Sequence, residues 1–109
     1  MFIAQQVASQ LIRVLRPLVE LIARHDSDLA AQVRTAGNSI TLNIAEGGRR
    51  VGKDRANRYR VAAGSTAEVR AALDAAVGWG YLRDEAVTKA LQLIDRELGL
   101  LWGLTHKRA

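Results

Sequence analysis

The spacing of apolar residues constrains the fold of this chain more than any other feature. Apolar side chains recur every three or four residues almost from end to end, and strand-like alternation is nowhere sustained. The pattern predicts four helices, at about 3–24, 27–46, 53–78 and 84–106. Connections this short make neighbouring helices antiparallel. We therefore expect an all-α protein, an antiparallel up-and-down four-helix bundle in which residues 1–109 form a single domain.

Short polar residues and glycines indicate where the helices begin and end. Asp26 or Ser27 can cap the second helix, and Asp84 can cap the fourth, because their side chains accept hydrogen bonds from free amides of a first turn. We predict that Gly80, in "GWGYL", ends the third helix, because helices often end at a residue in the left-handed conformation, which glycine adopts readily.

Pro17 lies inside the first predicted helix, where proline is unfavourable. It removes one hydrogen bond, and its ring presses on the carbonyl of Arg13. We expect a kink rather than two shorter helices meeting at Arg16, because the apolar seam continues through Leu18 and Leu21.

The charge and cysteine content limit the partners and the chemistry. Lys and Arg number 16 against 11 Asp and Glu, which gives a net charge of +5 and favours an anionic partner. The absence of Cys excludes a disulfide framework and thiolate chemistry, and it fits a cytoplasmic location. Polar residues interrupt every apolar window of the N-terminal segment, so no membrane span is expected.

The first and fourth helices are apolar over more of their circumference than one bundle core requires. A second apolar stripe usually marks an interface, because large exposed apolar patches are rare on monomers. We therefore expect a homo-oligomer, while the alternative that both stripes pack inside one wide core stays open. The additional residues are Ala8, Ile12, Leu15, Val19 and Ile22 in the first helix and Leu93, Leu100 and Leu104 in the fourth.

Two segments carry a family resemblance, "QVRTAGNSITLNIAEGGRR" and "AAGSTAEVRAALDAAVGWGYL". They resemble the QIRRAAxSIxxNIAEG-like second helix and the ALGSLAE…GYL-like third helix of the four-helix bundle family named for the 23S rRNA intervening-sequence proteins. The resemblance implies an assembly as a homopentameric ring. Relatives include the accessory variability determinant of diversity-generating retroelements, a ring that binds nucleic acid and a reverse transcriptase. Most members have no assigned activity.

The chain departs from the family pattern at the start of the third helix. The aromatic pair that is common at the start of this helix is replaced by Arg55 and Arg58, so the first turns of the helix are basic instead of apolar. The proline common after the "SI" of the second helix is Thr41 here, and we expect this helix to run straighter.

Two stripes of polar residues face each other in the predicted second and third helices. We expect them to form a hydrogen-bonded structural cluster that fixes the register of the two helices. Glu46 and Glu68 would also suit acid–base work or a divalent metal. The chain has no Glu-x-x-His, and His25 and His106 lie at element ends, so no catalytic, metal or cofactor site is predicted. The cluster comprises Ser39, Asn43, Glu46, Ser65 and Glu68.

The segment "RRVGKDRANRYR", residues 49–60, is called the basic elbow below. It is not a nucleotide-binding loop, because the G-x-x-x-x-G-K-[ST] spacing is absent and Asp54 stands where Ser or Thr is needed. Glycines end one helix, free amides begin the next, and cations surround the junction, which together attract phosphate. Arg55 either touches nucleic acid or pairs with a carboxylate at a subunit boundary. The predicted nucleic-acid-binding residues are Arg49, Arg50, Lys53, Arg58 and Arg60.

The aromatic residues argue against readout of a base sequence, because all four candidates fall at predicted core or turn positions. These are Tyr59, Trp79, Tyr81 and Trp102. The sequence thus favours a non-enzymatic oligomeric accessory protein that binds RNA or DNA through backbone phosphates. The alternative is a ring-forming scaffold whose basic elbow docks a protein partner, such as a reverse transcriptase.

Overall fold

The computed structural model describes residues 2–106; residues 1 and 107–109 of the predicted domain lie outside this range. It contains α1 (Ile3–Ala23), α2 (Ser27–Gly48), α3 (Gly52–Gly78), the 3-10 turn η1 (Asp84–Val87) and α4 (Thr88–Thr105), and the described range holds no strand. The all-α prediction is confirmed. The largest departures are that α2 runs two residues further and that a 3-10 turn precedes α4.

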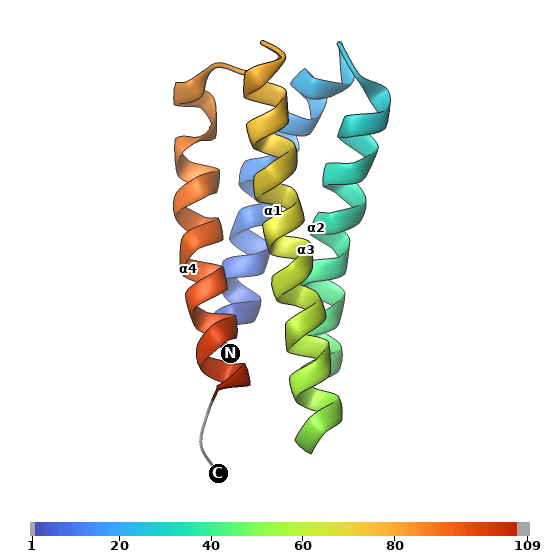
Figure 1. The fold of residues 1–109 in the computed structure, drawn as a ribbon, viewed down its shortest axis with the longest axis vertical. Helices are drawn as coiled ribbons and strands as arrows, with labels where there is room; N and C mark the ends of the chain where they lie inside the picture. Colours follow the sequence, from blue (N-terminus) through green and yellow to red (C-terminus); the bar gives the residue numbers. More distant parts are fainter. Residues whose placement is uncertain (1, 107–109) are drawn as a thin grey trace.

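The helices form a closed antiparallel square. Each of α1 and α3 packs against both α2 and α4, in a body of 46 × 22 × 22 Å. Figure 1 shows the α1–α2 and α3–α4 connections at one end, and the start of α1, the end of α4 and the start of α3 at the other. This second end, which also carries the basic elbow, is called the elbow end.

Capping explains the start of α2 but not the start of the fourth element. Asp26 lies just before α2, and its side chain accepts a hydrogen bond of 2.9 Å from the backbone amide of Leu29, so the predicted cap is Asp26. The prediction for Asp84 is wrong: this residue is the first of η1, which follows Arg83 without a side-chain cap.

A glycine ends α3 as predicted. The amide of Gly80 donates to the carbonyl of Val77 at 2.9 Å, and the amide of Tyr81 donates to the carbonyl of Ala76 at 2.8 Å. This is the Schellman arrangement, and it needs a left-handed residue. Gly80 provides it, with a φ of 81°.

Pro17 lies inside a helix that stays continuous from Ile3 to Ala23, which excludes two helices meeting at Arg16. Leu18 and Ile22, which follow the proline, are both buried in the bundle core. Burial of the same apolar face on both sides of the proline holds the helix together despite the missing hydrogen bond.

The wide apolar face of α1 is largely explained by the core of a single chain. Four of the five additional α1 residues, Ala8, Leu15, Val19 and Ile22, are buried, and Ile12 remains 36% exposed. The additional α4 leucines pack partly buried against the same core. The expected homo-oligomer therefore cannot rest on these stripes. No helix within residues 2–106 is both long and apolar enough to span a membrane.

Candidate nucleic-acid interface

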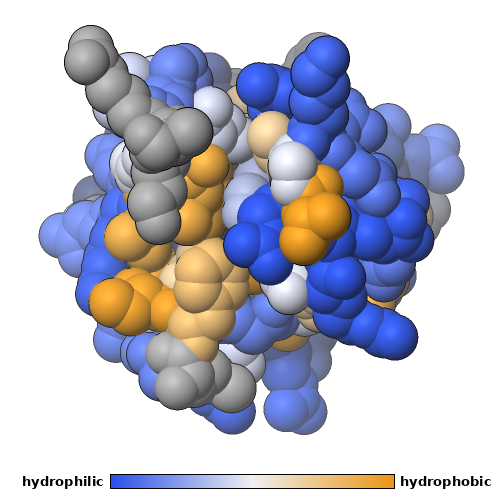
Figure 2. Space-filling model, turned by 90° about the horizontal axis from the view of Figure 1, so that it is seen from below, coloured by the Kyte–Doolittle hydropathy of each residue, from blue (hydrophilic) through white to orange (hydrophobic). Residues whose placement is uncertain are grey.

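The basic elbow is built by the end of α2, a short connection and the first turns of α3. α2 ends at Gly48 with Arg49 as its C-cap, and Val51 then adopts an extended conformation. Gly52 has a φ of 60°, a left-handed conformation that favours glycine. α3 starts there without a side-chain cap, so the amides of its first turn stay available. Viewed from the elbow end, Figure 2 shows hydrophilic surface surrounding two separate apolar patches.

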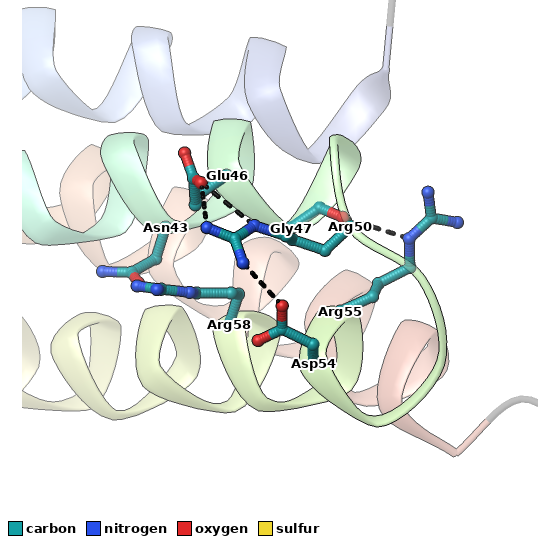
Figure 3. A network of polar contacts seen from close by, with 7 residues as sticks. All are labelled: Asn43, Glu46, Gly47, Arg50, Asp54, Arg55 and Arg58. Carbon is teal, nitrogen blue, oxygen red and sulfur yellow. Dashed lines mark hydrogen bonds and ion pairs between the residues drawn. The ribbon is translucent and has the colours of Figure 1, made fainter.

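Arg50 is held between two carboxylates, as Figure 3 shows. Its Nη2 lies 2.7 Å from Oε1 of Glu46, and its Nη1 lies 2.8 Å from Oδ2 of Asp54. The hydrogen bond and charge of Arg50 lower the pKa of Glu46, and the two carboxylates raise the pKa of Arg50. Because its charge is already balanced, Arg50 is a weaker phosphate ligand than the sequence suggests. Its bonds instead tie the end of α2 to the start of α3.

Arg55 closes the end of α2. Its Nε donates to the carbonyl oxygen of Gly47 at 3.0 Å (Figure 3). Its Nη2 donates to the carbonyl oxygen of Gly48 at 3.3 Å. The last carbonyls of a helix lack partners within the helix and favour a cation. The structural alternative for Arg55 is thus supported, although its partners are backbone carbonyls rather than a carboxylate at a subunit boundary.

Arg58 points along the seam between α2 and α3 and is half-buried. Its Nη1 makes a long contact of 3.5 Å with Oδ1 of Asn43, and its Nε is buried without a partner among residues 2–106. In Figure 3 its guanidinium lies beside the side chain of Asn43. The same cation helps to lower the pKa of Glu46. Arg58 is therefore committed mainly to the interior of the helix pair.

Three elbow cations are both exposed and without a polar contact in the described range. Arg49, Lys53 and Arg60 are exposed, and none makes a side-chain hydrogen bond or ion pair within the described range. Lys53 and Arg60 are seven residues apart on α3, so they project in nearly the same direction. The candidate interface thus consists of Arg49, Lys53 and Arg60 beside the uncapped start of α3.

The predicted polar cluster is only partly assembled. Oγ of Ser39 and Oγ of Ser65 are 2.7 Å apart across the α2–α3 seam. Nδ2 of Asn43 donates to the backbone oxygen and to Oγ of Ser39, at 2.9 and 3.2 Å. Glu46 bonds to Arg50 instead, and Glu68 is exposed with no polar partner in the part that the structure describes. Glu68 therefore does not belong to the hydrogen-bonded cluster.

This separation also removes the carboxylate pair that was considered for acid–base work. Glu46 bonds to Arg50, whereas Glu68 makes no hydrogen bond or ion pair among residues 2–106, so no contact links the two carboxylates there. No group of three His, Asp or Glu side chains within residues 2–106 could hold a metal ion.

Gly47 is a packing residue that positions the elbow. A Cβ at this position would lie 2.4 Å from Cε1 of Tyr59, so only glycine lets the tyrosine ring approach α2. Tyr59 is buried, and its ring lies 6.0 Å from that of Phe2, centroid to centroid. The glycine of the "NIAEG" motif therefore supports the close approach of α1, α2 and α3 at this end.

Both tryptophans are more exposed than their predicted core or turn positions suggest. Trp79 is 73% exposed and Trp102 is 63% exposed, with Trp102 stacked on His106 at a centroid distance of 4.2 Å. Tyr59 is buried as expected, while Tyr81 is partly buried and stacks on His25. Periodicity places a residue on a helix face, but it does not show where the neighbouring helix ends.

Glu97 is a buried ionisable residue that sequence reasoning missed. It lies on α4, fully buried, and neither carboxyl oxygen has a hydrogen-bond partner among the described residues. Burial raises the pKa of Glu97 to about 8, with a smaller opposing effect of Arg96. The signal was present in the sequence, since Glu97 stands in line with Ile94 and Leu101 on the apolar face.

These features define an all-α protein, a closed antiparallel four-helix bundle with a basic surface at one end. The sequence matches the family of 23S rRNA-intervening sequence proteins over residues 2–103, and the chain belongs to this family.

A solved structure supports the fold. The chain is similar to a protein of unknown function from the S23 ribosomal protein family of Bacteroides thetaiotaomicron, with a TM-score of 0.86 and 17% sequence identity. The match covers 95% of this chain and 99% of that one. At this identity the likeness concerns the fold alone. A search of curated proteins found no match.

Proposed function

We propose that the protein is a non-enzymatic, oligomeric accessory protein that binds RNA or DNA through backbone phosphates at the basic elbow. The observation that carries this proposal is the set of three exposed elbow cations, Arg49, Lys53 and Arg60, which form no ion pair or side-chain hydrogen bond among residues 2–106. Such cations displace the counterions of a nucleic acid and gain affinity that does not depend on base sequence. The proposal places the protein in the cytoplasm.

Three cations give one chain only weak affinity. An oligomer repeats the elbow, so that one nucleic acid contacts several copies and the effective concentration of each further contact rises. We propose a ring for this reason, with the pentamer implied by the family resemblance as the expected form.

The salt dependence of binding tests the proposal. Fluorescence anisotropy is measured with short single-stranded RNA and DNA probes over a salt series. We expect log K to fall linearly with log salt, and the triple variant Arg49→Gln, Lys53→Gln, Arg60→Gln to bind more weakly with a slope about 2 units shallower per engaged chain. Absence of binding at low salt would remove the proposal.

A matched control distinguishes the effect of the elbow cations on binding from the effect of total net charge. Arg24, Arg83 and Lys89 are exposed cations near the opposite end of the bundle (Figure 1). Their triple replacement by Gln changes the net charge equally and should leave the slope close to that of the unmodified protein. Equal losses in both triple variants would show that total charge, and not the elbow, drives binding.

A second candidate function is a scaffold that docks a protein, such as a reverse transcriptase of a retroelement, on the elbow. The exposure of Trp102, near the end of α4 and therefore at the elbow end, favours it, because tryptophan is enriched at the energetic centres of protein interfaces. Co-purification with a reverse transcriptase encoded beside this chain, lost in the elbow triple variant, combined with no nucleic-acid binding at low salt, would favour the scaffold.

A further inference from the structure

A basic groove runs between α1 and α2. Two cavities of about 420 and 330 Å³ lie side by side, because Ile12, Arg13 and Asn38 line both of them. Their apolar lining includes Leu15 and the partly exposed Ile12. Arg13, Arg16 and Arg34 stand against one carboxylate, Glu20, which leaves a net charge of +2. Arg16 and Glu20 form only a loose surface pair, 3.9 Å apart.

An acidic groove runs between α3 and α4. Its volume is about 690 Å³, and its apolar lining includes Leu73, Val77 and Leu91. Three carboxylates of its lining, Asp74, Asp84 and Asp95, stand against one cation, Arg70, so its net charge is −2. Arg70 is already paired with Asp95. Asp74 and Asp84 are exposed and have no ionic partner within residues 2–106.

The two grooves lie on opposite sides of the bundle. Contacts join α1 to α2, α2 to α3, α3 to α4 and α4 to α1, so the α1–α2 face is turned away from the α3–α4 face (Figure 1). Each chain thus carries one basic and one acidic groove, both with apolar linings and with equal and opposite net charges. The acidic groove of a second copy is therefore complementary in charge to the basic groove of the first, and the reverse also holds.

We propose that the basic α1–α2 groove of one copy packs against the acidic α3–α4 groove of the next. Such a head-to-tail contact uses different surfaces on the two partners and propagates until it closes into a ring or grows as a filament. Apolar burial supplies the affinity, and the opposite charges set the orientation and exclude basic-to-basic pairing. This inference specifies the assembly assumed in the proposed function, but it does not require nucleic acid.

Charge reversal tests the contact, with mass measured by size-exclusion chromatography and light scattering in the absence of nucleic acid. Arg13→Glu with Arg34→Glu turns the basic groove from +2 to −2, and Asp74→Lys with Asp84→Lys turns the acidic groove from −2 to +2. Each double variant then juxtaposes like charges, so we expect association to weaken at least about tenfold. The quadruple variant restores opposite charges and should reassemble.

The control is Arg24→Glu with Lys89→Glu, which changes net charge as much as the basic-groove variant but lies outside both groove linings. It should keep the mass of the unmodified protein. Circular dichroism melting confirms that each variant is folded. A monomeric unmodified protein, double variants of unchanged mass, or a folded quadruple variant that stays dissociated would each overturn the inference. The elbow triple variant should retain its mass, so failure of nucleic-acid binding is distinguished from failure of assembly.

Discussion

Arg50, Arg55 and Arg58 lie in the basic elbow with their guanidinium groups already engaged inside the chain, by carboxylates, by helix-end carbonyls and by Asn43, respectively. Arg49, Lys53 and Arg60, which are just as basic in sequence, point into solvent without such partners in the described range. The difference depends on which oxygen atoms the folded helix pair brings close enough to each side chain for a polar contact. Individual cations of a basic segment are therefore not equivalent ligands.

Glu97 shows the cost of a carboxyl group placed in an apolar core. In the folded chain its pKa is about 8, whereas its ordinary value is 4.5. Between these pH values the folded state binds a proton that the unfolded state has released. Stability therefore falls as the pH rises through this window, and it levels off above about pH 8.

We predict that Glu97→Gln raises the melting temperature, by an amount that grows between pH 5 and pH 8. Gln keeps the size of the side chain and cannot ionise, so it removes a penalty on the order of a few kcal/mol at the alkaline end. Thermal melts of both proteins over this pH range provide the measurement. Parallel curves for the two proteins would mean that Glu97 does not titrate abnormally.

At the scale of the elements, the α2–α3 pair is the unit that carries the elbow. These two helices make the most extensive contact in the bundle. Gly47 allows the ring of Tyr59 to lie against α2, and the hydroxyls of Ser39 and Ser65 meet across the same seam. The position of the surface cations therefore depends on small residues at the interface of the two helices.

We predict that Gly47→Ala destabilises the protein by about 1 to 3 kcal/mol, because the new methyl group collides with the Tyr59 ring and forces it to move. The adjacent Gly48→Ala is a matched control, since a Cβ there meets no atom within 4 Å, and it should be neutral or slightly stabilising. Urea unfolding measures both. Equal stabilities of the two variants would contradict the close packing.

At the scale of the whole molecule, the bundle separates two kinds of surface. The basic elbow lies at one end of the long axis, and the two oppositely charged grooves lie along opposite sides. A ring closed through the side grooves would leave the elbow of every copy free at its end. Assembly and phosphate binding can therefore operate together without competing for the same residues.

We predict that Asp74→Lys with Asp84→Lys weakens binding to a long RNA, although it adds positive charge. The change should dissociate the assembly and so remove the avidity of repeated elbows. Binding of a short oligonucleotide that spans one elbow should be unchanged or slightly tighter. Anisotropy with both probe lengths gives the comparison, and tighter binding of the long RNA would show that net charge outweighs assembly.

The sequence by itself determined the four helices and most of their ends, because helical periodicity, Asp26 and Gly80 act through neighbours within a few residues. It also located the basic elbow and the Ser39–Ser65 stripe. Only the tertiary structure decided that Arg50 is neutralised, that Glu68 stands alone, that Glu97 is buried and that most of the second stripe of α1 belongs to the core. These outcomes depend on atoms brought together from distant parts of the chain, which a local pattern does not encode.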